Sequence, residues 1–293
     1  MCLGFIMKRQ YLVLAIGVIS VSFAAIFIRL AEAPSLVIAA YRMGLASLVV
    51  IPLALARSRN ELRRLSRQEV LLALASGAFL ALHFGLWIAS LSYTSVATSV
   101  IMVTTTPIFV AIVSYFIFHE KLGKQTGIGI AISVAGSALI GYGNWKLGAG
   151  SLFGGILALL GALAVVGYLI IGRRLMRSIS LLSYISLAYG SAAALLILAS
   201  LAAGHSLTGY SNQTHLMLGL LALVPQLIGH SSVNWALRFI SATLVTIAVL
   251  GEPVGATTLA FFILKEPPMV SEIIGGILIL SGIFIAFRKS ENP

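Results

Sequence analysis

Residues 106–120 of the chain read TPIFVAIVSYFIFHE, and residues 252–266 read EPVGATTLAFFILKE. Each stretch has a proline at its second position and a glutamate at its last, with an apolar run between them. The two prolines, Pro107 and Pro253, are 146 residues apart, and the closing glutamates keep the same separation. Because these features recur in register, the two stretches predict an internal duplication.

The composition indicates a membrane protein. Of the 293 residues, 59% are hydrophobic and 9% are charged, whereas soluble domains average about 45–50% and about 25%. A soluble fold of this length has too little interior to bury so much apolar surface, so the bilayer must act as its solvent. The single cysteine excludes a disulfide framework and a cysteine-ligated metal site. We expect neither a metal nor a cofactor.

Ten segments satisfy the length requirement for a membrane-spanning helix, which is about 20 mostly apolar residues. The predicted fold class is therefore an all-α integral membrane protein with ten transmembrane helices. No connecting segment is long enough to form a second domain. The predicted helices are 11–30, 35–57, 69–93, 96–118, 122–142, 152–172, 182–203, 215–237, 242–263 and 270–288.

The basic residues predict the orientation, because Lys and Arg prefer cytoplasmic loops. When the N-terminus is placed inside, most of the 19 Lys and Arg residues fall in cytoplasmic loops. Both termini should then be cytoplasmic, in a multi-pass protein of the cell inner (cytoplasmic) membrane. This distribution also explains the net charge of +11 without a nucleic-acid partner.

The duplication extends beyond the two quoted stretches. Residues 91–142 align with residues 237–288 at a constant shift of 146, and the shared positions include a proline, a glutamate and glycines. We therefore expect a five-helix unit in residues 1–146 and a second one in residues 147–293. Because five is odd, the second unit enters the membrane inverted. Inverted repeats in transporters frame a site near the bilayer midplane and support alternating access.

At these residues the chain resembles a known family. The stretches TTTPIFVAIVSYFIFHEKL and VLGEPVGATTLAFFILKEPP, each followed by a glycine-spaced helix, look like the motif of the EamA-type family of the drug/metabolite transporter superfamily. The resemblance covers nearly the whole chain. It implies a ten-helix bundle with a central cavity lined mainly by helices 1–4 and 6–9. Within the family, the sequence is similar to the YddG-like group of amino-acid exporters.

Polar residues within the predicted spans are candidate binding residues, since buried polar groups in a membrane are costly and often functional. His83 and Trp87 share a face of the third helix, and Gln226, His230 and Asn234 form a stripe on the eighth. These two helices are equivalent in the repeats, so the polar groups should face each other. They would suit a zwitterionic or aromatic metabolite. The alternative is that they only hold the helices together.

The fourth helix and its equivalent supply further candidates. Ser99, Met102 and Thr106 follow one another at helical spacing, and the shift of 146 carries Thr106 onto Glu252. Glu252 is the one acid that we place inside a span. It is the candidate for coupling transport to a proton or for pairing with an amine. The alternative is a hydrogen bond to backbone that Pro253 leaves free.

Three further features complete the predicted site. Arg42 lies inside the second helix, where it either snorkels to the outer surface or binds a substrate carboxylate. Tyr168 on the sixth helix is a candidate lining residue. Pro107 and Pro253 should interrupt their helices and let them bend. The glycine pairs that recur at the repeat spacing predict close packing of the last helix of each half; they are Gly129 with Gly275 and Gly136 with Gly282.

The function that these features favour is a secondary transporter that exports small metabolites, above all amino acids, across the inner membrane. Its partners would be the substrate and the lipid bilayer, and the oligomeric state stays open. A first alternative is a sugar-phosphate or nucleotide-sugar exchanger, which would need several cations where the interior offers Arg42. The second is a membrane enzyme, which we disfavour because no cluster of catalytic residues is evident.

Overall fold

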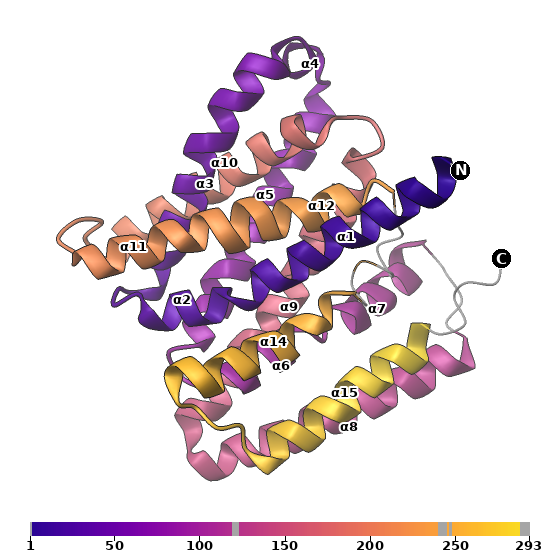
Figure 1. Ribbon diagram of the computed structural model, residues 1–293, viewed down its shortest axis with the longest axis vertical. Helices are drawn as coiled ribbons and strands as arrows, with labels where there is room; N and C mark the ends of the chain where they lie inside the picture. Colours follow the sequence, from indigo (N-terminus) through magenta and orange to yellow (C-terminus); the bar gives the residue numbers. More distant parts are fainter. Residues whose placement is uncertain (1, 119–122, 240–244, 246–247, 288–293) are drawn as a thin grey trace.

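The structure is a computed structural model, which describes residues 2–118, 123–239, 245 and 248–287. Every regular element in these residues is a helix, so the all-α prediction is confirmed (Figure 1). The helices of the first half are α1 Cys2–Ser22, α2 Ala24–Leu30, α3 Ser35–Arg57, α4 Arg59–Arg64, α5 Arg67–Ser90, α6 Val96–Val103, α7 Thr106–Phe118 and α8 Lys124–Leu147. Those that follow are α9 Ala149–Leu175, α10 Leu181–Ala202, α11 Asn212–Leu221, η1 Ala222–His230, α12 Ser231–Ala236, α14 Gly251–Leu259, η2 Ala260–Leu264 and α15 Val270–Phe287.

Within the described residues, seven helices are long and apolar enough to cross a membrane, and three shorter apolar helices accompany them. The shorter ones cover 96–110, 251–264 and 270–285, so they coincide with three of the ten predicted spans. The fourth predicted helix is divided into α6 and α7.

The repeat spacing reappears in the helix boundaries. Helix α3 begins at Ser35 and α10 at Leu181, and α8 begins at Lys124 and α15 at Val270. Both pairs of starts are 146 residues apart, which is the shift found in the sequence.

Helices α8 and α15 pack side by side and lie apart from most of the bundle (Figure 1). A Cβ atom built on Gly136 would lie 2.6 Å from the carbonyl oxygen of Gly275, and one on Gly282 would lie 2.5 Å from that of Gly129. The early glycine of each helix therefore meets the late glycine of the other, so the two helices run antiparallel. Antiparallel packing of equivalent helices is the arrangement that inverted halves require.

A hydrogen bond lies at the centre of this pair of helices. The hydroxyl of Ser133 donates to the carbonyl oxygen of Ile279 over 3.2 Å, and these two positions are again 146 residues apart. A contact between equivalent residues marks the place where a pseudo-two-fold axis crosses the pair.

Two glutamates join the halves at their loops. Glu266 accepts from the backbone N–H of Val96 over 2.6 Å and lies 3.5 Å from Nη2 of Arg29. Its counterpart in the repeat, Glu120, lies outside the described residues. In a second loop contact, Glu61 accepts from the backbone and hydroxyl of Ser180 and from the hydroxyl of Ser183.

Burial alone would raise the pKa of Glu61, but the hydrogen bonds from Ser180 and Ser183 outweigh it and hold that pKa below its ordinary value. The ionised carboxylate is therefore the form that caps the start of α10. This cap persists at neutral pH and is lost when the pH falls through the lowered pKa.

The close packing of α8 on α15 can be tested with one methyl group. Gly136→Ala should lower the midpoint of thermal unfolding in detergent, because the new Cβ would force α15 away at a cost of about 1–3 kcal/mol. Gly141→Ala on the same helix is the matched control, since its Cβ would meet nothing within 4 Å. There the gain in helix propensity, about 1 kcal/mol, should leave stability unchanged or raised. Equal behaviour of the two variants would contradict the glycine contact.

Candidate substrate-binding cavity

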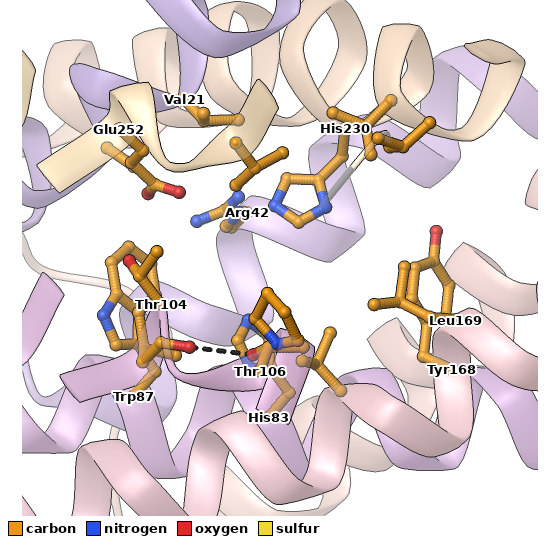
Figure 2. Close-up of a pocket in the computed structure, with 17 residues that line it drawn as sticks. Val21, Arg42, His83, Trp87, Thr104, Thr106, Tyr168, Leu169, His230 and Glu252 are labelled. Atoms are coloured by element: carbon orange, nitrogen blue, oxygen red, sulfur yellow. Dashed lines mark hydrogen bonds between the residues drawn. The ribbon is translucent and has the colours of Figure 1, made fainter. Parts of the chain in front are cut away.

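The break between α6 and α7 forms one wall of the site. The chain turns at Thr104 and Thr105, and Pro107 is the second residue of α7. Proline lacks an N–H, so the carbonyl of Val103, four residues earlier, has no helical donor. The hydroxyl of Thr106 supplies one over 2.8 Å (Figure 2). The hydroxyl of Thr106 therefore pairs the carbonyl that the proline leaves without a donor, which makes the break compatible with a membrane.

The neighbouring threonines also donate to backbone carbonyls, but each of those carbonyls already accepts from a backbone N–H. Thr104 donates through its hydroxyl to the carbonyl of Val100 over 2.5 Å, and Thr105 donates to that of Met102 over 2.7 Å.

Pro253, like Pro107, lies in the first turn of a helix, which here is α14, just after a turn at Leu250. The sequence predicted that both prolines interrupt their helices, and in the structure each one lies in the first turn of a new helical segment.

A cavity of about 100 Å³ lies beside this break, several times the roughly 10–15 Å³ that one water molecule needs. Residues from both halves of the chain enclose it (Figure 2). They are Val21, Ala24, Arg42, His83, Trp87, Val103, Thr104, Thr106, Pro107, Val165, Tyr168, Leu169, His230, Val233, Val245, Val249 and Glu252. Apolar walls with a few polar groups are typical of small-molecule sites.

Arg42 is the cation of this cavity, and its side chain is fully buried. Its Nε donates to Oε1 of Gln226 over 2.8 Å. The guanidinium carbon lies 3.9 Å from the centroid of the Phe84 ring and 5.8 Å from that of Trp87. The terminal nitrogens Nη1 and Nη2 have no hydrogen-bond partner among the described residues. The structure therefore buries Arg42 inside the bundle, which excludes the alternative that its side chain snorkels to the outer surface. The other alternative, binding of a substrate carboxylate, stays a prediction.

Glu252 faces Arg42 across the cavity, and Figure 2 shows the carboxylate and the guanidinium pointing toward one another. Both residues are described by the structure, yet no ion pair joins them. An acid and a base thus share one cavity with a gap between them.

Aromatic rings line the wall below this charged pair. The rings of His83 and Trp87 are stacked, with centroids 6.1 Å apart and planes at 5°. Nδ1 of His83 lies 2.9 Å from the carbonyl oxygen of Gly161; because a carbonyl only accepts, Nδ1 carries the proton and Nε2 stays available. The ring of Phe84 meets that of His230 edge-on at 5.3 Å. The third and eighth predicted helices therefore face each other, as the sequence predicts.

Two other predicted residues support the cavity from behind it. Gln226 lies in the π-helix η1, which contains Pro225, and it holds Arg42. Asn234 donates to the hydroxyl of Tyr168 over 2.5 Å and approaches that of Tyr189 at 3.4 Å. Tyr168 itself lines the cavity. These two amides position other side chains and do not line the cavity.

The repeat can be followed into the cavity wall. Three pairs of lining residues are 146 positions apart, namely Trp87 with Val233, Val103 with Val249 and Thr106 with Glu252. The contacting rings of Phe84 and His230 are a further equivalent pair. The cavity therefore lies where equivalent elements of the two halves meet.

Comparison with known proteins agrees with this arrangement. The profile of the EamA-like transporter family matches residues 8–142 and, a second time, residues 152–288. The chain belongs to this family. The resemblance inferred from its two proline stretches is thereby confirmed, and the double match divides the chain into two halves.

The curated relatives bear transporter names. The chain is 24% identical to the uncharacterized transporter YdfC of Bacillus subtilis over 67% of this chain and 63% of YdfC. It is 29% identical to the uncharacterized transporter YetK of the same organism over 69% of this chain and 62% of YetK. These matches span less than two thirds of either relative. An uncharacterized transporter of Clostridium kluyveri is 24% identical over 85% of this chain and 82% of its own length.

A crystal structure of another protein shares the fold. It superposes with a TM-score of 0.69 at 18% identity and covers 98% of this chain and 99% of that one. At this level of identity the likeness supports the fold alone. Together with the family match, it describes a multi-pass membrane protein of the EamA type.

Two predicted site residues of this EamA-type chain lie outside the cavity. Ser99 is fully buried, with its hydroxyl 2.6 Å from that of Ser90, and Met102 packs in a small core cluster with Ile108 and Ile140. The helical spacing that aligned them with Thr106 does not hold, because the break at Thr104 changes the phase of the helix.

Sequence reasoning missed several lining residues. Thr104 could have been found from its position before the proline. Phe84, which does not line the cavity itself but packs its ring against the guanidinium of Arg42, was also missed, because a phenylalanine in an apolar helix looks like any packing residue. The same is true of Val21, Val165 and Leu169, whose contribution depends on which helix faces they occupy.

The hydroxyl of Thr106 is open to a direct test. Thr106→Val keeps the shape but leaves the carbonyl of Val103 without its donor, so unfolding should become easier by about 1–3 kcal/mol. Thr106→Ser keeps the donor and serves as the matched control. The midpoint of thermal unfolding in detergent would measure the stability of both variants. A valine variant as stable as the serine variant would show that the carbonyl finds another partner.

Proposed function

We propose that the chain is a secondary transporter that exports amino acids and similar small metabolites across the cytoplasmic (inner) membrane. The family and the names of its relatives support transport. The observation that carries the substrate proposal is the cavity in which Arg42 and Glu252 face each other unpaired. An acid and a base across apolar and aromatic walls suit a molecule with one charge of each sign and an apolar side chain.

The proposed mechanism is alternating access of two inverted halves, residues 1–146 and 147–293. It is supported by the antiparallel pairing of α8 with α15 and by the equivalent residues that meet at the cavity. The helix breaks before Pro107 and Pro253 flank the same cavity, where bending would open one end and close the other. The start of α1 and the end of α15 lie toward one side in Figure 1, which agrees with both termini being cytoplasmic.

The cavity does not favour the alternatives. A sugar phosphate or nucleotide sugar carries several negative charges, whereas Arg42 is the one Lys or Arg among the described lining residues and Glu252 would repel such a substrate. A membrane enzyme is disfavoured by the family and by the transporter names of the relatives.

The function is tested by counterflow in proteoliposomes with a panel of amino acids. We expect saturable exchange of a subset that includes apolar side chains. Ala24→Phe should abolish it, because Ala24 lines the cavity and is almost fully buried. Ala56→Phe, on an exposed position of α3, is the matched control. Absence of exchange for every amino acid in the wild type would refute the substrate proposal.

The role of Glu252 in coupling needs a separate experiment. If export is exchanged for a proton, Glu252 must gain and lose that proton between the inward and outward states. Glu252→Gln keeps the shape and removes the charge, so the response of substrate flux to an imposed pH gradient should vanish. Flux down the substrate gradient should partly survive. A glutamine variant that still responds to the pH gradient would move the coupling role to His83 or His230.

A further inference from the structure

We infer that the two terminal nitrogens of Arg42 form a carboxylate subsite, and that a free carboxylate is the group this cavity requires of its substrate. The inference rests on the transport function proposed above and names the substrate group that the site selects. It is carried by the two donors Nη1 and Nη2 of this cavity-lining residue, which are buried and have no partner among the described residues.

The orientation of the guanidinium is fixed on two sides. Oε1 of Gln226 accepts from Nε at 2.8 Å, and the guanidinium carbon lies over the ring of Phe84, 3.9 Å from its centroid. A guanidinium is a rigid fork, so once Nε is engaged and its carbon packs on the ring, the terminal N–H groups keep a set direction. This arrangement presents two donors together, which is the geometry that a carboxylate matches with its two oxygens.

The cost of two buried donors without partners favours such a ligand. Buried donors without partners are rare in proteins and call for an explanation. A group that reaches Nη1 and Nη2 therefore stabilises them most when it brings acceptors for both nitrogens. A carboxylate supplies two charged acceptors. A carboxamide supplies one neutral acceptor and a competing N–H₂ group, so it should be rejected.

Glu252 limits which anions fit. Its carboxylate faces the same gap (Figure 2), so a second negative charge on the ligand would be repelled, whereas an ammonium group would be attracted. A phosphate dianion is therefore a poor match, and a monocarboxylate is a good one. Gln226 becomes a positioning residue in this scheme, because it acts on the substrate through Arg42.

The test compares acids with their amides on the full-length chain in detergent. Binding of each amino acid and of its α-amide is measured by titration calorimetry, together with isovalerate and isovaleramide, which lack the amine. The acids should bind about 10–100-fold more tightly than their amides, as expected for charged hydrogen bonds. Amides that bind as tightly as acids, or acids that do not bind at all, would overturn the inference.

Variants locate the preference on Arg42. Arg42→Gln should reduce the acid-to-amide affinity ratio to near one, while Arg57→Gln, at the exposed end of the same helix, should leave it unchanged. Gln226→Met should reduce the ratio only in part, because the guanidinium stays but loses its anchor. A purely structural role of Gln226 would weaken acids and amides equally. The methionine variant also keeps the inference testable if Arg42→Gln does not fold.

The outcomes separate this inference from the proposed function. Acid-specific binding that disappears in Arg42→Gln, without any amino-acid flux in proteoliposomes, would retain the subsite and reject the transport of amino acids. Flux that does not distinguish acids from amides would retain transport and reject the subsite.

Discussion

No backbone polar group can remain unpaired in the hydrocarbon core of a bilayer, and this constraint decides where the helices may break. Pro107 removes the donor for the carbonyl of Val103, and the hydroxyl of Thr106 restores it. Because the repair is made by a side chain and not by the backbone, the chain can turn at this point without exposing a carbonyl to lipid. The cavity follows from this break, since Thr104, Thr106 and Pro107 form part of its wall.

The same constraint explains why a charge is tolerated at Arg42. A buried guanidinium is costly unless its donors and its charge are compensated. Here Gln226 satisfies one donor, the ring of Phe84 offers its electron-rich face, and Glu252 supplies an opposite charge across the gap. The compensation is incomplete, because the two terminal nitrogens have no partner in the part of the chain that the structure describes. In a structural arginine this would be a defect, whereas in a binding site it is a source of affinity.

The sequence predicts much of this fold because its signals are physical and local. Length and apolarity identify spans, the Pro107 and Pro253 stretches identify the repeat, and the glycine pairs identify the contact of α8 with α15. The site is predicted less completely. Arg42, His83, His230 and Glu252 are rare polar residues in apolar runs, so the sequence alone identifies them as candidate site residues. Ser99 and Met102 were placed in the site because the break at Thr104, which changes the phase of the helix, was not foreseen. Phe84 was missed because its role depends on the guanidinium of Arg42 that packs on its ring.

The two halves share the repeat spacing but not their charges, and a transporter of an asymmetric substrate would need such a difference. Thr106 and Glu252 are equivalent positions, as are Arg42 and Ala188, so each half supplies one charge and its partner supplies a neutral residue. Two halves that exchange conformations about a pseudo-two-fold axis can present the same cavity to either side of the membrane. Because the acid and the base come from different halves and from non-equivalent positions, a zwitterion bound between them has one preferred orientation. In the proposed mechanism, duplication would provide the motion, and divergence at a few lining residues would provide the selectivity.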